Sequence, residues 1–273
     1  MIKISHDYKL FGKEINAMKK SYKKSQEIHN DSKCSIPEVV EYGMIIKNSD
    51  NLLEQEEPIL MSYMIMPRYG GNLENYFEKQ GCQMTNESIL QFGICMLRML
   101  EGIHAAGFTY NDIKLDNVLV GFQNKMNPES RNCFDNCTLH LVDFGFAQRY
   151  IDKKTRQHIE PQEIQTFRGN MIFASLNQLN FQMTSRRDDL ISLCYLLIYL
   201  LNGGNLKGID LTQNLSRNES FNLVKKAKTN HSISEFCCDN ASSIQHFCEI
   251  IFKLQFKETP NYKLLRDLLR NSL

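Results

Sequence analysis

Residues 110–117 read Tyr-Asn-Asp-Ile-Lys-Leu-Asp-Asn, and they form the most informative motif of the chain. Its Asp-x-Lys-x-x-Asn spacing is typical of phosphoryl-transfer loops, which need a carboxylate facing the nucleophile, a cation near the γ-phosphate and an oxygen ligand for magnesium. Asp112, Lys114 and Asn117 are the candidates for these three roles. Taken alone, the stretch fits a solvated polar loop equally well, so its context has to decide.

A second acidic segment supplies that context. Asp143 lies in the sequence Val-Asp-Phe-Gly and is a second candidate ligand for magnesium, beside Asn117. Residues 117–120 and 138–142 are short β-prone runs that predict a hairpin, which would bring the two ligands to the same end of its strands. Apolar residues at helical spacing over 89–103 predict an amphipathic helix just before the loop.

With these motifs in this order, the chain resembles the eukaryotic protein kinases, and more narrowly the casein kinase I family of serine/threonine kinases. The resemblance covers the whole chain, and its most specific element is an Arg-Arg-Asp-Asp run. The supporting stretches are residues 70–74, 114–117, 173–177, 185–190 and 260–266. The resemblance implies ATP and Mg²⁺ as cofactors, and serine or threonine hydroxyls of protein substrates as acceptors.

The resemblance also implies an α+β, protein-kinase-like two-lobed fold with a reduced N-terminal sheet and a mainly helical C-terminal lobe. Residues 1–273 would form one domain. Residues 1–66 would be the small lobe, with a strand, a helix to about Ile28 and two strands near 39–46 and 59–66. Residues 67–69 would be the hinge, and residues 70–273 the helical lobe.

Five further residues are expected to contact ATP or to position a residue that does. Lys3 looks like the lysine at the end of the kinase Val-Ala-Ile-Lys strand, and Glu14 like the helix glutamate that pairs with it. Each, taken singly, also fits an ordinary surface residue. Met66 is the expected gatekeeper, while the Pro67 carbonyl and the Tyr69 N–H would bind the adenine ring.

Several departures from the family are visible. No glycine-rich phosphate loop precedes Lys3, so an N-terminally truncated kinase with weakened nucleotide binding and a solvent-exposed Lys3–Glu14 pair is expected. Asn170 stands where the family has a threonine that steadies the base, and its amide could still hydrogen-bond Asp112. Ile172 replaces an arginine of an anion site, so recognition of phosphorylated substrates is expected to be weak.

The composition agrees with a single catalytic unit. The chain has 273 residues, is 42% hydrophobic and has a formal net charge of +1, so we expect a monomer with neither nucleic acid nor a membrane as partner. Nine cysteines without a signal peptide favour the cytoplasm or the nucleus. The most apolar run, 190–201, is too short to span a bilayer and predicts a buried helix. By resemblance, Asp189 just before it would hydrogen-bond the backbone of the catalytic loop.

Two functions of different class remain open. The first is an ATP-dependent serine/threonine protein kinase of casein kinase I type, which transfers the γ-phosphate of ATP to protein hydroxyls. The second is a truncated pseudokinase that keeps the fold as a protein-interaction scaffold. The presence of Asp112, Lys114, Asn117 and Asp143 favours the first, and the absence of a glycine-rich loop before Lys3 favours the second.

Overall fold

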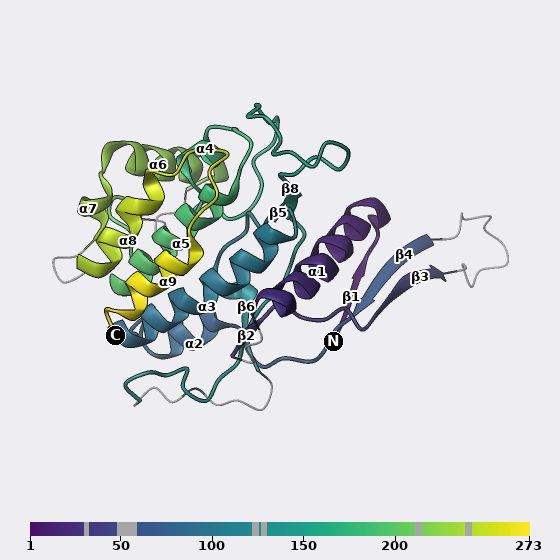
Figure 1. The fold of residues 1–273 in the computed structure, drawn as a ribbon, viewed down its shortest axis with the longest axis horizontal. Coiled ribbons are helices and arrows are strands. Elements are labelled where there is room, and N and C mark those ends of the chain that lie inside the picture. Colours follow the sequence, from purple (N-terminus) through teal and green to yellow (C-terminus); the bar gives the residue numbers. More distant parts are fainter. Residues whose placement is uncertain (30–32, 48–58, 122–125, 127–129, 211–214, 238–241) are drawn as a thin grey trace.

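The protein has two lobes, one built around a sheet and one built of helices (Figure 1). The computed structural model describes residues 1–29, 33–47, 59–121, 126, 130–210, 215–237 and 242–273. In the N-terminal lobe, strands β1 (Ile2–Ser5), β4 (Ile59–Ile65) and β3 (Glu41–Lys47) form an antiparallel sheet in that order. The predicted strands are therefore confirmed with end shifts of one or two residues, and the predicted loop 47–57 lies almost entirely outside the described residues.

One long helix, α1 (Tyr8–Ile28), packs against this sheet. Its first turn is capped by Asp7, whose carboxylate accepts two backbone N–H groups and so satisfies donors that the helix cannot. Phe11, Ile15 and Met18 recur at helical spacing and are buried, as the predicted apolar stripe requires. The buried face fixes the rotation of α1 about its axis, and this rotation determines which polar side chain points inward.

A small second sheet joins the two lobes. The predicted hairpin is confirmed as β6 (Val118–Val120) and β7 (Leu139–Leu141), which pair antiparallel. A strand that was not predicted, β2 (Cys34–Ser35), adds to β7 in parallel. Residues from the predicted small lobe thus extend the hairpin that follows the loop 110–117, and they tie the lobes together at this point.

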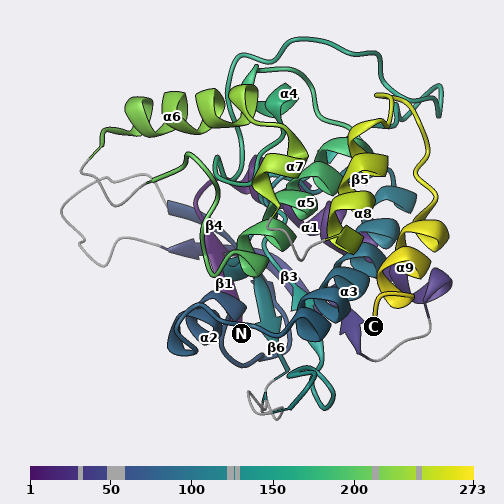
Figure 2. The same cartoon turned by 90° about the vertical axis from the view of Figure 1, so that its left-hand side faces the viewer.

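The C-terminal lobe is mainly helical. Its helices are α2 (Leu73–Lys79), α3 (Asn86–Ala105), α4 (Leu176–Leu179), α5 (Arg186–Leu201), α6 (Arg217–Asn230), α7 (Ile233–Phe236), α8 (Ser242–Phe252) and α9 (Tyr262–Arg270). A 3-10 turn (Leu115–Asn117) and a short strand pair, β5 (Phe108–Thr109) with β8 (Gln148–Arg149), complete it. The turned view of Figure 2 shows α5 near the centre, with α3 and α8 beside it.

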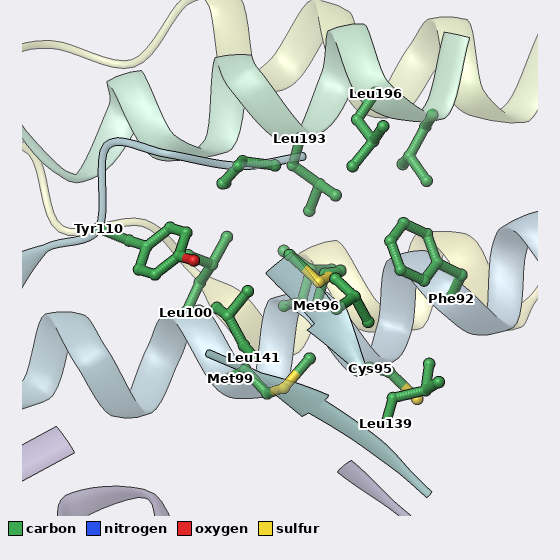
Figure 3. Close-up of a cluster of buried hydrophobic side chains, with 14 of the residues drawn as sticks. Phe92, Cys95, Met96, Met99, Leu100, Tyr110, Leu139, Leu141, Leu193 and Leu196 are labelled. Atoms are coloured by element: carbon green, nitrogen blue, oxygen red, sulfur yellow. The ribbon is translucent and has the colours of Figure 1, made fainter. Parts of the chain in front are cut away.

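The core of this lobe lies where α3, α5 and β7 meet. Figure 3 shows Met96 of α3, Leu193 of α5 and Leu141 of β7 pointing toward one another, and all three are fully buried. The helix α5 is buried nearly all round, which confirms the prediction for 190–201. Tyr110 projects from the loop 110–117 into the same cluster (Figure 3), so the first residue of the loop is packed in the hydrophobic core.

The end of α1 is fastened to the helical lobe. A Cβ atom at Gly102 of α3 would lie 2.7 Å from the Cβ of Ser25, so only glycine allows the two helices to come this close. Beyond α1, the His29 Nε2 atom lies 2.8 Å from Oε2 of Glu101, and the same carboxylate pairs with Arg266 of α9. This junction joins three helices and holds the C-terminal end of α1 in place.

The position of α5 at the centre of the core predicts the cost of opening a cavity there. Leu196→Ala removes a side chain that is 0% exposed, so we expect the free energy of unfolding to fall by about 2–5 kcal/mol. Leu264→Ala on α9 is the matched control, because that side chain is 46% exposed and its loss should cost about 0.5 kcal/mol or less. Urea denaturation measures both, and equal midpoints would contradict the central position of α5.

Candidate active site

The loop 110–117 is held by its first two residues. The hydroxyl of Tyr110 donates to the Val142 carbonyl, and its ring packs edge-on against Phe144 with centroids 5.3 Å apart. Asn111 adopts the left-handed region at φ 70°, and its amide donates to the Phe146 carbonyl at 2.9 Å. These contacts bind the loop to the segment that contains Asp143. None of these three contacts was predicted from the sequence.

A buried carboxylate organises the backbone of the same loop. The two oxygens of Asp189 accept the N–H groups of Tyr110 and Asn111, both at 2.7 Å. His104 Nε2 lies 2.8 Å from Oδ2 of the same carboxylate, while its Nδ1 atom pairs with the Tyr262 hydroxyl. The predicted contact between Asp189 and the loop backbone is confirmed. Its support by His104 and Tyr262 is a finding of the structure.

Three predicted site residues lie together within the loop. Asp112 is buried, with 2% of the residue exposed, and its Oδ2 atom accepts from Asn117 Nδ2 at 2.8 Å. Lys114 Nζ lies 3.3 Å from the same oxygen. The Asn117 amide also donates to the Asp112 carbonyl at 2.9 Å, so both of its hydrogens are used and its oxygen is the atom left to ligate a metal.

Asn170 does not bond Asp112, so that part of the sequence interpretation is wrong. Its side-chain oxygen instead accepts two backbone N–H groups of the turn that follows it. Two residues that sequence analysis missed support the loop here. Gln178 donates to the Asn111 carbonyl at 3.2 Å, and a Cβ at Gly169 would lie 2.0 Å from that same oxygen. The positive φ of +93° at Gly169 also favours glycine, so this close approach requires that residue.

The predicted Lys3–Glu14 pair forms, and Asp143 joins it. Lys3 Nζ lies 2.7 Å from Glu14 Oε1 and 3.0 Å from Asp143 Oδ1. The expectation of a solvent-exposed pair is wrong for Glu14, which is 6% exposed because the packed face of α1 turns it inward, while Lys3 is 37% exposed. The backbone of Asp143 is left-handed, with φ 59°, which directs its carboxylate toward this cluster.

The electrostatics of this cluster follow from its burial. Burial alone lowers the pKa of Lys3, but the hydrogen bonds and charges of Glu14 and Asp143 outweigh it, so the pKa is raised. Burial raises the pKa of Glu14, and the lysine only partly offsets this. The lysine therefore stays protonated beside two acidic side chains, one buried and one half-exposed.

The predicted hinge residues lie in the connection between β4 and α2. Met66 is buried and Pro67 is exposed. The Tyr69 ring stacks on His140 of β7 with centroids 4.2 Å apart, and burial raises its pKa to about 12. The N–H of Gly70 then donates to a carbonyl of β6 at 2.7 Å. The predicted hinge residues are therefore followed directly by backbone pairing with β6.

Asn117 and Asp143 are neighbours across that hairpin. The Val142 N–H donates to the Asn117 carbonyl at 2.9 Å, which sets the two candidate metal ligands side by side. Among the described residues, no group of three or more His, Cys, Asp or Glu side chains could hold a metal ion. A magnesium ion at this place would complete its coordination with phosphate and water oxygens, as magnesium usually does. The oxygen donors present fit that ion.

The family follows from a comparison with known proteins. The protein kinase domain family matches residues 2–269. The chain belongs to the protein kinase family. It is 31% identical over 210 residues to casein kinase I homolog 2 of Schizosaccharomyces pombe, covering 77% of this chain and 46% of that protein. It is 30% identical over 215 residues to casein kinase I homolog 1 of Saccharomyces cerevisiae, covering 78% of this chain and 38% of that protein.

These comparisons confirm the predicted resemblance to the casein kinase I group and the two-lobed kinase fold. This kinase-family chain spans less than half the length of either relative. Within its described residues, no helix combines the length and the apolar character that crossing a membrane requires.

The support that Asp189 gives to the loop can be tested by a change of one atom. Asp189→Asn leaves one acceptor oxygen where the Tyr110 and Asn111 N–H groups and His104 now share two. We expect the free energy of unfolding to fall by about 1–3 kcal/mol, because a buried donor loses its partner. Asp267→Asn on α9 is the control, since that carboxylate is 39% exposed and its loss should cost about 0–1 kcal/mol. Equal costs in urea denaturation would remove Asp189 from this role.

The burial of His140 predicts an acid sensitivity near the predicted hinge residues. Burial lowers its pKa to about 4 from the usual 6.5. Between these values the unfolded chain binds a proton that the folded protein does not, so stability falls as the pH drops from 6.5 toward 4. We expect His140→Gln to make thermal unfolding less sensitive to pH in this window, with His6→Gln, at an exposed site, as the control. An unchanged pH profile in His140→Gln would refute the assignment.

Proposed function

We propose that this domain is an ATP-dependent serine/threonine protein kinase of casein kinase I type, which transfers the γ-phosphate of ATP to hydroxyl groups of protein substrates. One observation supports it above all others. A single loop presents a buried carboxylate, an amide and a lysine, next to a second lysine that two carboxylates hold. Phosphoryl transfer requires such a set, because the phosphoryl group must be positioned and its charge neutralised.

In this proposal Asp112 is the base. As the acceptor hydroxyl oxygen bonds to the γ-phosphorus, its proton passes to the carboxylate of Asp112, and the bond from phosphorus to the β–γ bridging oxygen breaks to release ADP. Lys114, 3.3 Å from that carboxylate, neutralises charge on the transferred group. The hydrogen bond from Asn117 to Asp112 fixes the rotamer of the base.

The remaining residues hold the nucleotide. Lys3, positioned by Glu14, would contact the α- and β-phosphates, and Asn117 and Asp143 would hold Mg²⁺ against them. When bound, that ion would offset the negative charge of the phosphates. Lys3 Nζ lies 3.0 Å from Asp143 Oδ1 in this structure. Bound nucleotide and metal would contact these same two side chains, either beside their ion pair or in place of it.

The adenine ring would lie at the connection that joins the lobes. Met66 would border the ring as gatekeeper, the Pro67 carbonyl would accept from the adenine amine, and the Tyr69 N–H would donate to the ring. The stacking of the Tyr69 side chain on His140 supports this, because it leaves the backbone of the connection in a fixed position. In this proposal residues 1–66 and 70–273 act as the two lobes of one domain.

The experiment separates the base from the nucleotide site. Asp112→Asn should keep the rise in melting temperature caused by ATP and magnesium, because Asp112 acts on the acceptor hydroxyl. Transfer of phosphate to an acidic, casein-like peptide should fall by about 100-fold or more. Asp116→Asn is the matched control, since this neighbouring aspartate of the loop is exposed, and it should retain most of the activity.

Each alternative has its own outcome. Equal turnover in Asp112→Asn and the parent would exclude Asp112 as the base. A parent that shows neither a magnesium-dependent shift at millimolar ATP nor phosphate transfer would favour the scaffold function instead.

A further inference from the structure

A second cluster of charged side chains lies outside the site described above. It lines an open groove of about 540 Å³ between α1 and the segment that contains β8 and the turn after it. Figure 1 shows the first turns of α1 on the same side of the molecule as this segment. The lining contains six cationic side chains and no carboxylate. The cations are Lys9, Lys13, Lys20, Arg149, Lys153 and Arg156.

The described residues place no carboxylate within ion-pair distance of these six cations. The Lys9 ammonium lies over the ring of Tyr8, and the Arg149 guanidinium lies over the ring of Phe108. These contacts with neutral rings leave the positive charges of both side chains in place. Partial desolvation and three neighbouring cations lower the pKa of Lys20. Like charges held this close repel one another, and a bound anion would relieve the repulsion.

The cations are also held in place. The turn after β8 is closed by Asp152, whose carboxylate accepts the backbone N–H groups of Lys154 and Thr155, both at 2.8 Å. Arg156 donates its N–H to the Asp152 carbonyl at 3.1 Å and has a left-handed backbone, φ 60°, in a region that glycine occupies more readily. With α1 as the opposite wall, a ligand would meet cations whose backbone is already ordered.

We propose that this groove docks an acidic, phosphorylated segment of a partner protein. Lysine and arginine favour phosphate oxygens, and a phosphorylated segment supplies several such groups at short spacing. The lining has no aromatic side chain on which nucleic-acid bases could stack, and no apolar side chain to enter a membrane. The volume lies in the usual range of ligand pockets.

Docking here would act on α1. The helix that forms one wall of the groove also positions Glu14, and the other wall continues from the segment of Asp143. An anion that bridges the walls would hold α1 against that segment and favour the observed Lys3 contacts. The groove is a second site, separate from the one proposed for phosphoryl transfer, and can be tested without nucleotide.

The test is a binding measurement on the full chain in the absence of ATP. The probe is a fluorescein-labelled peptide of glutamates and phosphoserines, followed by fluorescence anisotropy. Lys13→Glu with Lys153→Glu should weaken binding at least about tenfold, because two attractions become repulsions. Lys226→Glu with Lys253→Glu makes the same change of charge at exposed sites on and after other helices, and should change affinity by less than about twofold.

Further arms make the result decisive. The parent should bind the phosphorylated peptide more tightly than the same peptide with serine, and equal affinity for the two overturns the proposal. So does equal weakening by the groove and control variants. If the groove variant does not fold, Lys13→Gln with Lys153→Gln replaces it, and should weaken binding at least about threefold. Tighter binding of a single-stranded oligonucleotide or an anionic vesicle, lost in the groove variant, would assign the groove to those ligands instead.

Discussion

The arrangement of the site depends on one buried carboxylate near the start of α5, a helix that is buried nearly all round. A loop without regular secondary structure has backbone N–H groups that need acceptors, and burial makes an unpaired donor costly. Asp189 satisfies two consecutive donors from a helix that the core holds rigidly. These two hydrogen bonds therefore hold the start of the loop in a fixed position relative to α5. The side chains of Asp112 and Asn117, which follow within a few residues, are positioned through this contact.

Local pattern was enough to predict much of this fold. The amphipathic spacing of α1, the apolar run of α5 and the β-prone runs of the hairpin each contain their own signal, because periodicity reports which face is buried. The candidate site was found in the same way, since Asp112, Lys114 and Asn117 lie within one short motif. Their mutual contacts agree with that motif, and the ends of the predicted elements moved by only a few residues.

What could not be predicted depends on contacts between distant parts of the chain. The two-residue strand β2 is too short to show a period, and only β7 makes it a strand. The support from Gln178 and Gly169 depends on a carbonyl more than fifty residues away in sequence, so no local signal marks it. The basic groove joins residues near 9–20 with residues near 149–156, and a formal net charge of +1 conceals it.

The junction at the end of α1 has a mechanical consequence. The close contact of Ser25 with Gly102 and the paired charges at Glu101 fix one end of the helix to the large lobe, while its other end lies beside the sheet. Any opening of the lobes that preserves this junction is a rotation with its pivot there. In such a rotation a point on α1 moves in proportion to its distance from the pivot. The first turns of the helix then travel furthest, and Glu14, which lies in the first half of the helix, travels roughly two thirds as far.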